Sequence, residues 1–178
     1  MKRHRMRGAF DVFLISWALA GCGDPTGPAD DFVLTAQVNG RAWQAGGPGG
    51  PPHAFFYEGD STISVGGGRL GSGYSDGIAV SIRRVTGPGT YPLGDPATSS
   101  AGLYSRLQGT LGDGTSTWTW YWTSAVRRGT VVLTAFEPST NTLQGTFTFE
   151  AETALGAWVT VTGGSFSGHY QTSNGKGS

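Results

Sequence analysis

Cysteine and lysine are scarce in this chain. Its 178 residues include one cysteine, Cys22, and two lysines, Lys2 and Lys176. A single cysteine excludes an internal disulfide, so stability must come from buried apolar surface and backbone hydrogen bonds. Apolar residues at helical spacing over more than two turns are also absent, and 31 glycines oppose helix further. These absences argue against helical and disulfide-rich folds.

Long hydrophobic runs are lacking as well. The apolar segment VFLISWALAG, residues 12–21, has ten residues, whereas a transmembrane helix needs about 20. Four basic residues precede it, at positions 2, 3, 5 and 7. A basic start followed by a short apolar run is typical of a secretory signal peptide, here residues 1–21.

The end of this run, Leu19-Ala20-Gly21-Cys22, resembles the lipobox of bacterial lipoproteins. The resemblance implies cleavage before Cys22, a diacylglycerol thioether on its sulfur and usually a third acyl chain on the new amino terminus. Several acyl chains anchor a protein stably, and lipidation also accounts for an odd cysteine in an exported chain. The residue after the cysteine is Gly23 rather than Asp, which favours sorting to the outer membrane. Whether the domain would lie on the periplasmic or the surface side of that membrane is left open. The alternative is a plain secreted protein with a free thiol.

A mature chain starting at Cys22 would have 157 residues, enough for one domain with a sizeable core. Removing four basic residues and Asp11 leaves 8 basic and 11 acidic residues, a net charge of −3. That balance disfavours binding to nucleic acid. We expect the lipidated cysteine and a flexible tether at 22–31, an all-β domain at 32–170 and a disordered tail at 171–178.

The first strand and turn can be placed residue by residue. Apolar residues alternate in FVLTAQV, residues 32–38, as in a half-buried strand. Asn39-Gly40 follows, the dipeptide best suited to a two-residue type I′ turn. Such a hairpin pairs Val38 with Arg41 and Ala36 with Trp43, which places Trp43 on the apolar face.

Similar short runs continue along the chain, separated by Gly, Pro, Asp and Asn. They predict an antiparallel β-sandwich or flattened barrel of about eight to ten strands, with AGGPGGPP at 45–52 as a loop. The runs are HAFFYE, TISVG, DGIAVSIRR, AGLYSRL, STWTWYWTS, GTVVLTAFE, NTLQGTFTFEAE, AWVTVT and SFSGHY.

A β-bulge or tight bend is predicted at Gly163-Gly164. Val159 and Val161 share one face of an extended strand, whereas Phe166 and Tyr170 share the other. A regular strand could not bury both sets on one side. Glycine tolerates the positive φ that some bulges need.

Four segments together resemble a family of uncharacterised bacterial lipoproteins with the pattern V-N-G-x-x-W, G-T-F-x-F and V-T-x-G-x-F. They are FVLTAQVNGRAW at 32–43, GPGTYPL at 87–93, LQGTFTFEA at 143–151 and VTVTGGSFSGHY at 159–170. The resemblance implies a shared β-rich domain over 32–170 and an envelope location. It implies no catalytic residue, because the family carries no assigned activity.

Two motif matches suggest chemistry that their context does not support. Gly73–Gly77, GYSDG, fits the G-x-S-x-G nucleophile elbow around Ser75, but that elbow needs a following helix. Gly66–Gly71, GGGRLG, fits the dinucleotide motif, which also needs a helix. We therefore expect a turn at Ser75, a flexible loop at 66–71 and no cofactor.

Metal-ligating patterns are weak. His53 and His169 are not in a ligand-spaced pair. A site built in space from His169 and Glu150 or Glu152 is less favoured than solvated side chains, and we expect the two glutamates on a polar outer face. We expect no metal.

Two arginine pairs stand at the ends of predicted strands, Arg83-Arg84 and Arg127-Arg128. The favoured interpretation is solvated turn residues. The alternative is contact with acidic glycans or lipopolysaccharide phosphates.

Tryptophan occupies every second position of residues 118–122, so Trp118, Trp120 and Trp122 share one strand face. The favoured interpretation is that this face packs in the core with Trp120 most buried, because three open indoles would leave too much apolar surface in water. In the alternative, the indoles line a groove and stack on a sugar. The core interpretation turns four residues outward: Thr117, Thr119, Tyr121 and Thr123.

These observations predict a lipid-anchored envelope protein that acts as a non-catalytic binding or interaction module, with a glycan or an envelope protein as partner. The residues expected to contact such a ligand are Trp118, Trp120, Trp122 and Tyr121. A structural or assembly accessory of the outer membrane without a small-molecule site is the alternative. A hydrolase is the third and weakest hypothesis.

Overall fold

The computed structural model describes residues 31–47, 50–71, 74–109 and 116–173, which form twelve β-strands. The all-β prediction is therefore confirmed. Within these ranges, no helix has the length and apolar character needed to cross a membrane. Cys22 and positions 23–30 of the predicted tether lie outside the described residues.

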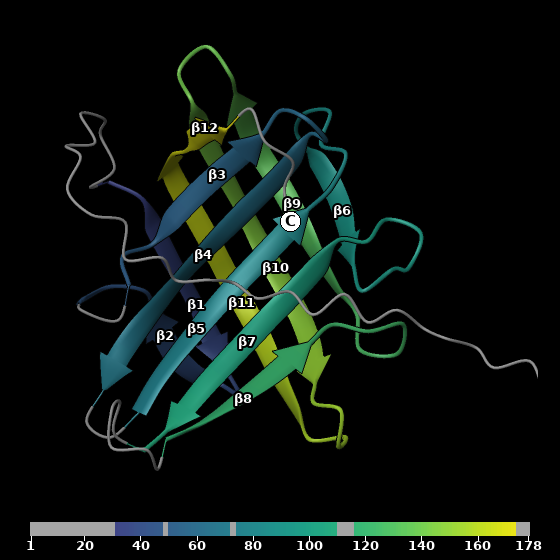
Figure 1. The fold of residues 1–178 in the computed structure, drawn as a ribbon. Coiled ribbons are helices and arrows are strands. Elements are labelled where there is room, and N and C mark those ends of the chain that lie inside the picture. Colours follow the sequence, from purple (N-terminus) through teal and green to yellow (C-terminus); the bar gives the residue numbers. More distant parts are fainter. Residues whose placement is uncertain (1–30, 48–49, 72–73, 110–115, 174–178) are drawn as a thin grey trace, which may run out of the picture.

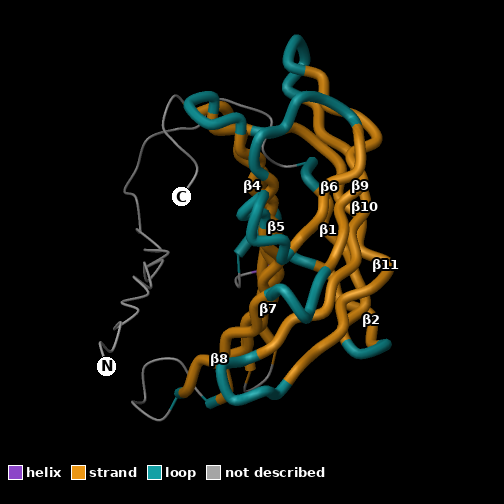
Figure 2. The backbone as a smooth tube through the Cα atoms, turned by 90° about the vertical axis from the view of Figure 1, so that its right-hand side faces the viewer, coloured by secondary structure: helices purple, strands orange, loops and turns teal. Residues whose placement is uncertain are grey.

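The strands form two packed layers of one continuous, open sheet (Figures 1 and 2). Pairing runs β12-β3-β4-β5-β7-β8-β10-β11-β1-β2, with β9 and β6 joined to β10 in a branch. In Figure 2, β4, β5 and β7 lie in one layer and β1, β6, β9, β10 and β11 in the other. Strand β8 links the layers at one end, since it pairs with both β7 and β10.

The strand bounds are β1 Val33–Val38, β2 Arg41–Gln44, β3 His53–Tyr57, β4 Thr62–Gly71, β5 Tyr74–Ile82, β6 Gly89–Leu93, β7 Ala101–Gln108, β8 Thr117–Trp122, β9 Gly129–Glu137, β10 Thr142–Glu152, β11 Trp158–His169 and β12 Gln171–Ser173.

The opening hairpin has the predicted geometry. Val38 pairs with Arg41 and Ala36 with Trp43. Both turn residues have positive φ, 49° at Asn39 and 77° at Gly40, as a type I′ turn requires. Trp43 is buried in the main core, so the motif brings a large aromatic side chain between the layers.

The predicted bulge at Gly163-Gly164 is confirmed. Along β11, Ser165 pairs with Thr35 and Thr162 with Gln37, so two residues of β11 oppose one of β1. The ladder to β10 shifts at the same place. Gly163 has φ +55°, and the extra residue lets Val159, Val161 and Phe166 all face the core.

Three segments differ from the predictions. Residues 66–71 belong to β4 rather than to a flexible loop, and Ser75 lies in β5 rather than in a turn. Residues 171–173, predicted as part of a disordered tail, form β12 and pair in parallel with β3; residues 174–178 lie outside the described ranges.

Close packing explains the glycine at position 67 of β4. A Cβ at Gly67 would lie 2.6 Å from the Ala45 Cβ and 3.1 Å from the Pro52 Cα. The loop at 45–52 therefore reaches the strand only because Gly67 has no side chain. Glycine, taken in the sequence as a sign of flexibility, here permits close contact.

The core lies between the layers and follows the period-two pattern. In the β4–β5–β7 layer, its inward residues include Ile63, Val65, Ile78, Val80 and Tyr104. At one end of the layer, the inward positions become charged. That change defines the site described below.

Candidate functional site

The three tryptophans of β8 lie on the outer surface of the domain, and the core interpretation is wrong. Trp118, Trp120 and Trp122 are 42%, 37% and 39% exposed. Trp120 is the least exposed, as predicted, but by a small margin. The indole rings of Trp118 and Trp120 stack, with centroids 5.4 Å apart and an interplanar angle of 22°.

The pairing of β8 with β7 explains this orientation. Trp118 pairs with Leu107 and Trp122 with Leu103, so these side chains share the outer face. Leu103 and Leu107 are 6% and 1% exposed, yet neither belongs to the main core. From this pairing we infer a second, smaller apolar cluster of the tryptophans and these leucines, in which the leucines cover part of each indole.

Tyr121 lies on the opposite face from the tryptophans. It packs against the main core, and its ring centroid is 5.6 Å from that of Tyr104. The prediction that Tyr121 turns outward is therefore wrong, and this residue does not share a surface with the three indoles.

We call Trp118, Trp120 and Trp122 the tryptophan face. With about 250 Å² for a whole indole side chain, their exposed fractions leave about 300 Å² of aromatic surface in water. The largest apolar patch of a typical monomer covers about 300–600 Å² and often has a function. This area is sufficient for a surface that binds a flat ligand.

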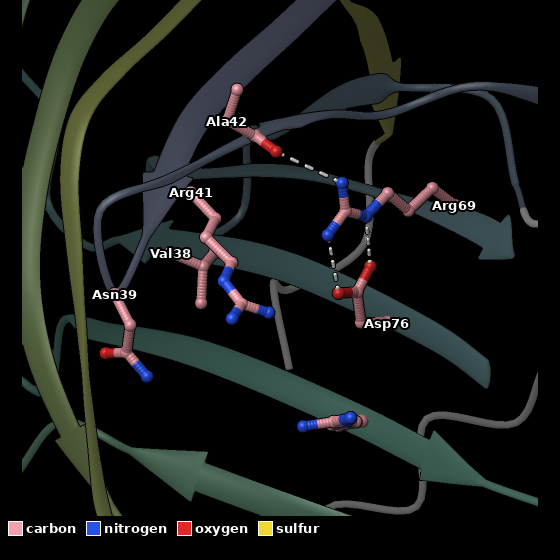
Figure 3. A pocket seen from close by; sticks show the side chains of 7 residues that line it. Val38, Asn39, Arg41, Ala42, Arg69 and Asp76 are labelled. Carbon is pink, nitrogen blue, oxygen red and sulfur yellow. Dashed lines mark hydrogen bonds and ion pairs between the residues drawn. The ribbon is translucent and has the colours of Figure 1, made fainter.

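A second site lies on the inward face, where three strands place charged side chains in one row. Arg69 of β4 pairs with Asp76 of β5, and Asp76 pairs with Arg106 of β7. All three continue the inward positions occupied by apolar residues farther along each strand. The hairpin of β1 and β2 adds Arg41 from the other layer, close to this row (Figure 3).

Asp76 is the centre of a buried hydrogen-bond network. Its Oδ1 accepts from Trp43 Nε1 at 2.8 Å and from Arg69 Nε at 2.7 Å. Its Oδ2 accepts from Arg69 Nη2 at 3.1 Å and from Tyr104 Oη at 3.2 Å. Four donors satisfy a carboxylate whose side chain is only 5% exposed.

The network keeps Tyr104 protonated and fixes the position of Arg69. Burial, followed by the nearby Asp76 carboxylate, raises the pKa of the Tyr104 phenol, so Tyr104 stays a neutral donor to Asp76. Arg69 also donates from Nη1 to the Ala42 carbonyl at 3.2 Å. Its guanidinium is therefore held between the two layers.

Arg69, Asp76 and Arg106, together with residues of the β1–β2 hairpin, line a pocket of about 540 Å³. Its lining residues are Val38, Asn39, Arg41, Ala42, Arg69, Asp76 and Arg106. Ligand pockets commonly measure about 300–1,000 Å³. We call this site the arginine pocket; its lining includes three arginines and one carboxylate, of which Arg69 and Asp76 form an ion pair.

Comparison with protein families identifies the domain over nearly its whole length. Residues 31–168 match the model of DUF6252, a domain of unknown function. The chain belongs to this family. Searches of curated proteins and of solved structures find no match.

The DUF6252 match contains both sites, since the tryptophan face and every residue of the arginine pocket lie between positions 31 and 168. Strand β12 follows the last matched residue.

Sequence reasoning did not find the arginine pocket. Its arginines are separated by 28 and 37 positions along the chain; strand register aligns Arg69 and Arg106 with Asp76, whereas Arg41 comes from the other layer. A signal was nevertheless present. Arg69 and Arg106 occupy positions where continued alternation requires an inward side chain, and Asp76 does the same in β5.

The residues considered as candidate metal ligands do not come together in one site. His169 Nδ1 lies 2.9 Å from Asp31 Oδ2, while Glu150 and Glu152 pair with Arg127 at 2.8 and 3.8 Å. The hypothetical site of His169 with these glutamates is thus not formed. In the described part of the chain, no group of three His, Cys, Asp or Glu residues could hold a metal ion.

Arg127 differs from the solvated turn residue predicted. Besides its two glutamate partners, its guanidinium carbon lies 4.5 Å from the ring centroid of Trp158. Glu150 and Glu152 follow the outward pattern of β10, as predicted. Arg84 is exposed with φ +57°, in keeping with a turn residue.

Ser75 lacks the surroundings of a nucleophile. It is buried in β5, and its hydroxyl donates to the Arg69 carbonyl at 3.3 Å. A nucleophile elbow requires an exposed serine on a strand-to-helix turn, whereas strand β5 continues through this position.

Proposed function

We propose that this DUF6252 protein is a lipid-anchored bacterial envelope protein that acts as a non-catalytic binding module, and that its tryptophan face binds a glycan. The anchor is supported by the lipobox-like end of the apolar run at Cys22. The binding role is supported by three indoles held outward on one strand.

The orientation of the indoles is the observation that carries this proposal. Sheets that pack on one side usually present polar residues on the other, yet β8 presents Trp118, Trp120 and Trp122. Their Cα atoms are about 6.8 Å apart, two residues of an extended strand, and the Trp118 and Trp120 rings stack with centroids 5.4 Å apart, so the indoles form one continuous aromatic row. Flat sugar rings stack on such a surface through their C–H groups, while the indole N–H groups donate to hydroxyls.

The Trp120→Ala variant tests the binding role. Full-length protein in detergent would be incubated with insoluble polysaccharides, including purified peptidoglycan and cellulose, and the bound fraction measured. We expect Trp120→Ala to weaken binding at least tenfold, as for a central aromatic residue of an interface. Trp158→Ala is the matched control, because Trp158 is 50% exposed but lies on β11 beside Arg127.

Unchanged binding by Trp120→Ala, with lower stability, would show that the indoles serve only to cover Leu103 and Leu107. That result would favour the structural or assembly accessory, the alternative role. An equal loss in Trp120→Ala and Trp158→Ala would indicate non-specific adhesion of aromatic residues.

The Cys22→Ser variant tests the anchor. Serine has no thiol to form the thioether, so the variant should move from the membrane fraction to the soluble fraction on envelope fractionation. Two or more acyl chains provide stable anchoring, so we expect most of the protein to be released. A variant that stays as firmly membrane-bound as the parent would refute lipidation at Cys22.

A further inference from the structure

The arginine pocket carries an excess of positive charge in a chain that otherwise has few charged residues. Arg69 and Asp76 form a close pair and neutralise each other, with Nε to Oδ1 at 2.7 Å. Arg41 and Arg106 then contribute two uncompensated positive charges. Neither has a hydrogen bond or ion pair with any other described residue.

The pocket is also preorganised. Arg69 is 30% exposed but is fixed by Asp76 on one side and by the Ala42 carbonyl on the other. The turn that carries Arg41 is held by Asn39, whose Oδ1 accepts from Thr160 N at 2.9 Å and from Thr160 Oγ1 at 3.2 Å. Binding would require little rearrangement of the backbone, which lowers its entropic cost.

We propose that the arginine pocket binds a small molecule with a doubly charged anionic group, a phosphate or a pair of carboxylates. Guanidinium groups match these anions because each can donate two parallel hydrogen bonds to two oxygens. The charge of such a group, about −2, balances the +2 of Arg41 and Arg106 together. This site lies between the layers, so it is independent of the tryptophan face on the outside.

The strands around the pocket explain why it forms here. The interior of a sandwich normally excludes unpaired charge because desolvation is costly. Asp76 is buried but accepts four hydrogen bonds, whereas Arg41 and Arg106 are exposed at the end of the layers. An anion at this end can reach both arginines without being fully desolvated.

Isothermal titration calorimetry tests the proposal. Full-length protein in detergent would be titrated with inorganic phosphate and with citrate at one fixed ionic strength, with glucose as the neutral control. We expect saturable binding of at least one anion and none of glucose. Arg41→Gln and Arg106→Gln should each weaken binding about tenfold, the usual effect of losing one charge-assisted hydrogen-bonding group.

Arg83→Gln is the matched control. Arg83 follows β5 directly, seven residues from Asp76 on an extended path, or about 24 Å. Its removal changes the net charge equally without touching the pocket, so the affinity should stay within twofold. Because Arg41 and Arg106 have exposed side chains, both variants should melt within a few degrees of the parent.

Three results would overturn the proposal. One is an absence of binding for both anions at millimolar concentration. Another is binding that survives in the Arg41→Gln, Arg106→Gln double variant. The last is an equal loss in Arg83→Gln, which would reveal a diffuse charge effect. None of these results depends on the tryptophan face, so the glycan proposal is tested separately.

Discussion

The two faces of the β7–β8 ladder reverse the usual arrangement of a sandwich. At this end of the domain, the inward face carries Arg106 and Thr119, while the outward face carries Leu107 and the tryptophans. Farther along β7, the inward face carries Tyr104 and belongs to the main core. The reversal is therefore local, and it marks both candidate sites.

The two faces differ in how far their atypical residues, a buried carboxylate inside and exposed indoles outside, are compensated by their neighbours. Inside, the buried Asp76 carboxylate is compensated, because it accepts hydrogen bonds from Trp43, Arg69 and Tyr104. Outside, apolar surface is only partly covered, and each indole keeps about two-fifths of its area in water. The satisfied hydrogen bonds make the Asp76 network rigid. The partly exposed indoles, in contrast, leave an apolar surface that a binding partner can cover.

The largest expected effect comes from removing the inward network. Asp76→Ala leaves Trp43 Nε1 and Tyr104 Oη without their acceptor and Arg69 without its counter-ion. We expect a loss of about 3–5 kcal/mol in the free energy of unfolding, measured by urea denaturation followed by circular dichroism.

Glu137→Ala serves as the control for that measurement, because Glu137 is an exposed carboxylate at the end of β9. It should change stability by less than about 0.5 kcal/mol. If Asp76→Ala also cost less than 1 kcal/mol, the network would be a consequence of the fold rather than one of its supports.

A smaller effect is expected on the outward face. Leu107→Ala removes a side chain that is 1% exposed but lies outside the main core. We expect a loss of about 2–3 kcal/mol, at the low end for a buried leucine, since the indoles can settle into the space. Urea denaturation followed by tryptophan fluorescence would measure both the stability and the change in the indoles' surroundings.

Leu70→Ala is the matched control, since Leu70 lies on the outer face of β4 and is 41% exposed. It should cost well under 1 kcal/mol. Equal losses for the two leucines would mean that the tryptophan face does not cover Leu107, and the contrast between the faces would disappear.

Local features of the fold could be predicted from the sequence. The Asn39-Gly40 hairpin was predicted with its register because both turn residues tolerate positive φ. The bulge at Gly163-Gly164 was predicted because the apolar residues change from odd to even positions along this segment. A regular strand cannot place both sets on the same face. Each rests on neighbouring residues and on side-chain alternation.

Features that depend on distant pairing could not be predicted in the same way. Period two shows that Trp118, Trp120 and Trp122 share a face, but the ladder to β7 decides that this face is outside. The arginine pocket needs three strands in register and a hairpin from the second layer. Glycine at position 67 was misread because its neighbour, Ala45, is distant in sequence.

The direction of β1 bears on where the tether would join the domain. The strand begins at Val33, next to the end of the chain that leads to Cys22, and finishes at Val38 in the wall of the arginine pocket. Five steps of extended chain separate these ends by about 17 Å. With an acyl anchor at Cys22, the tether would therefore join the domain at the end of β1 that lies away from the pocket. The arginines would thus lie at the opposite end of the strand from the point where the tether is attached.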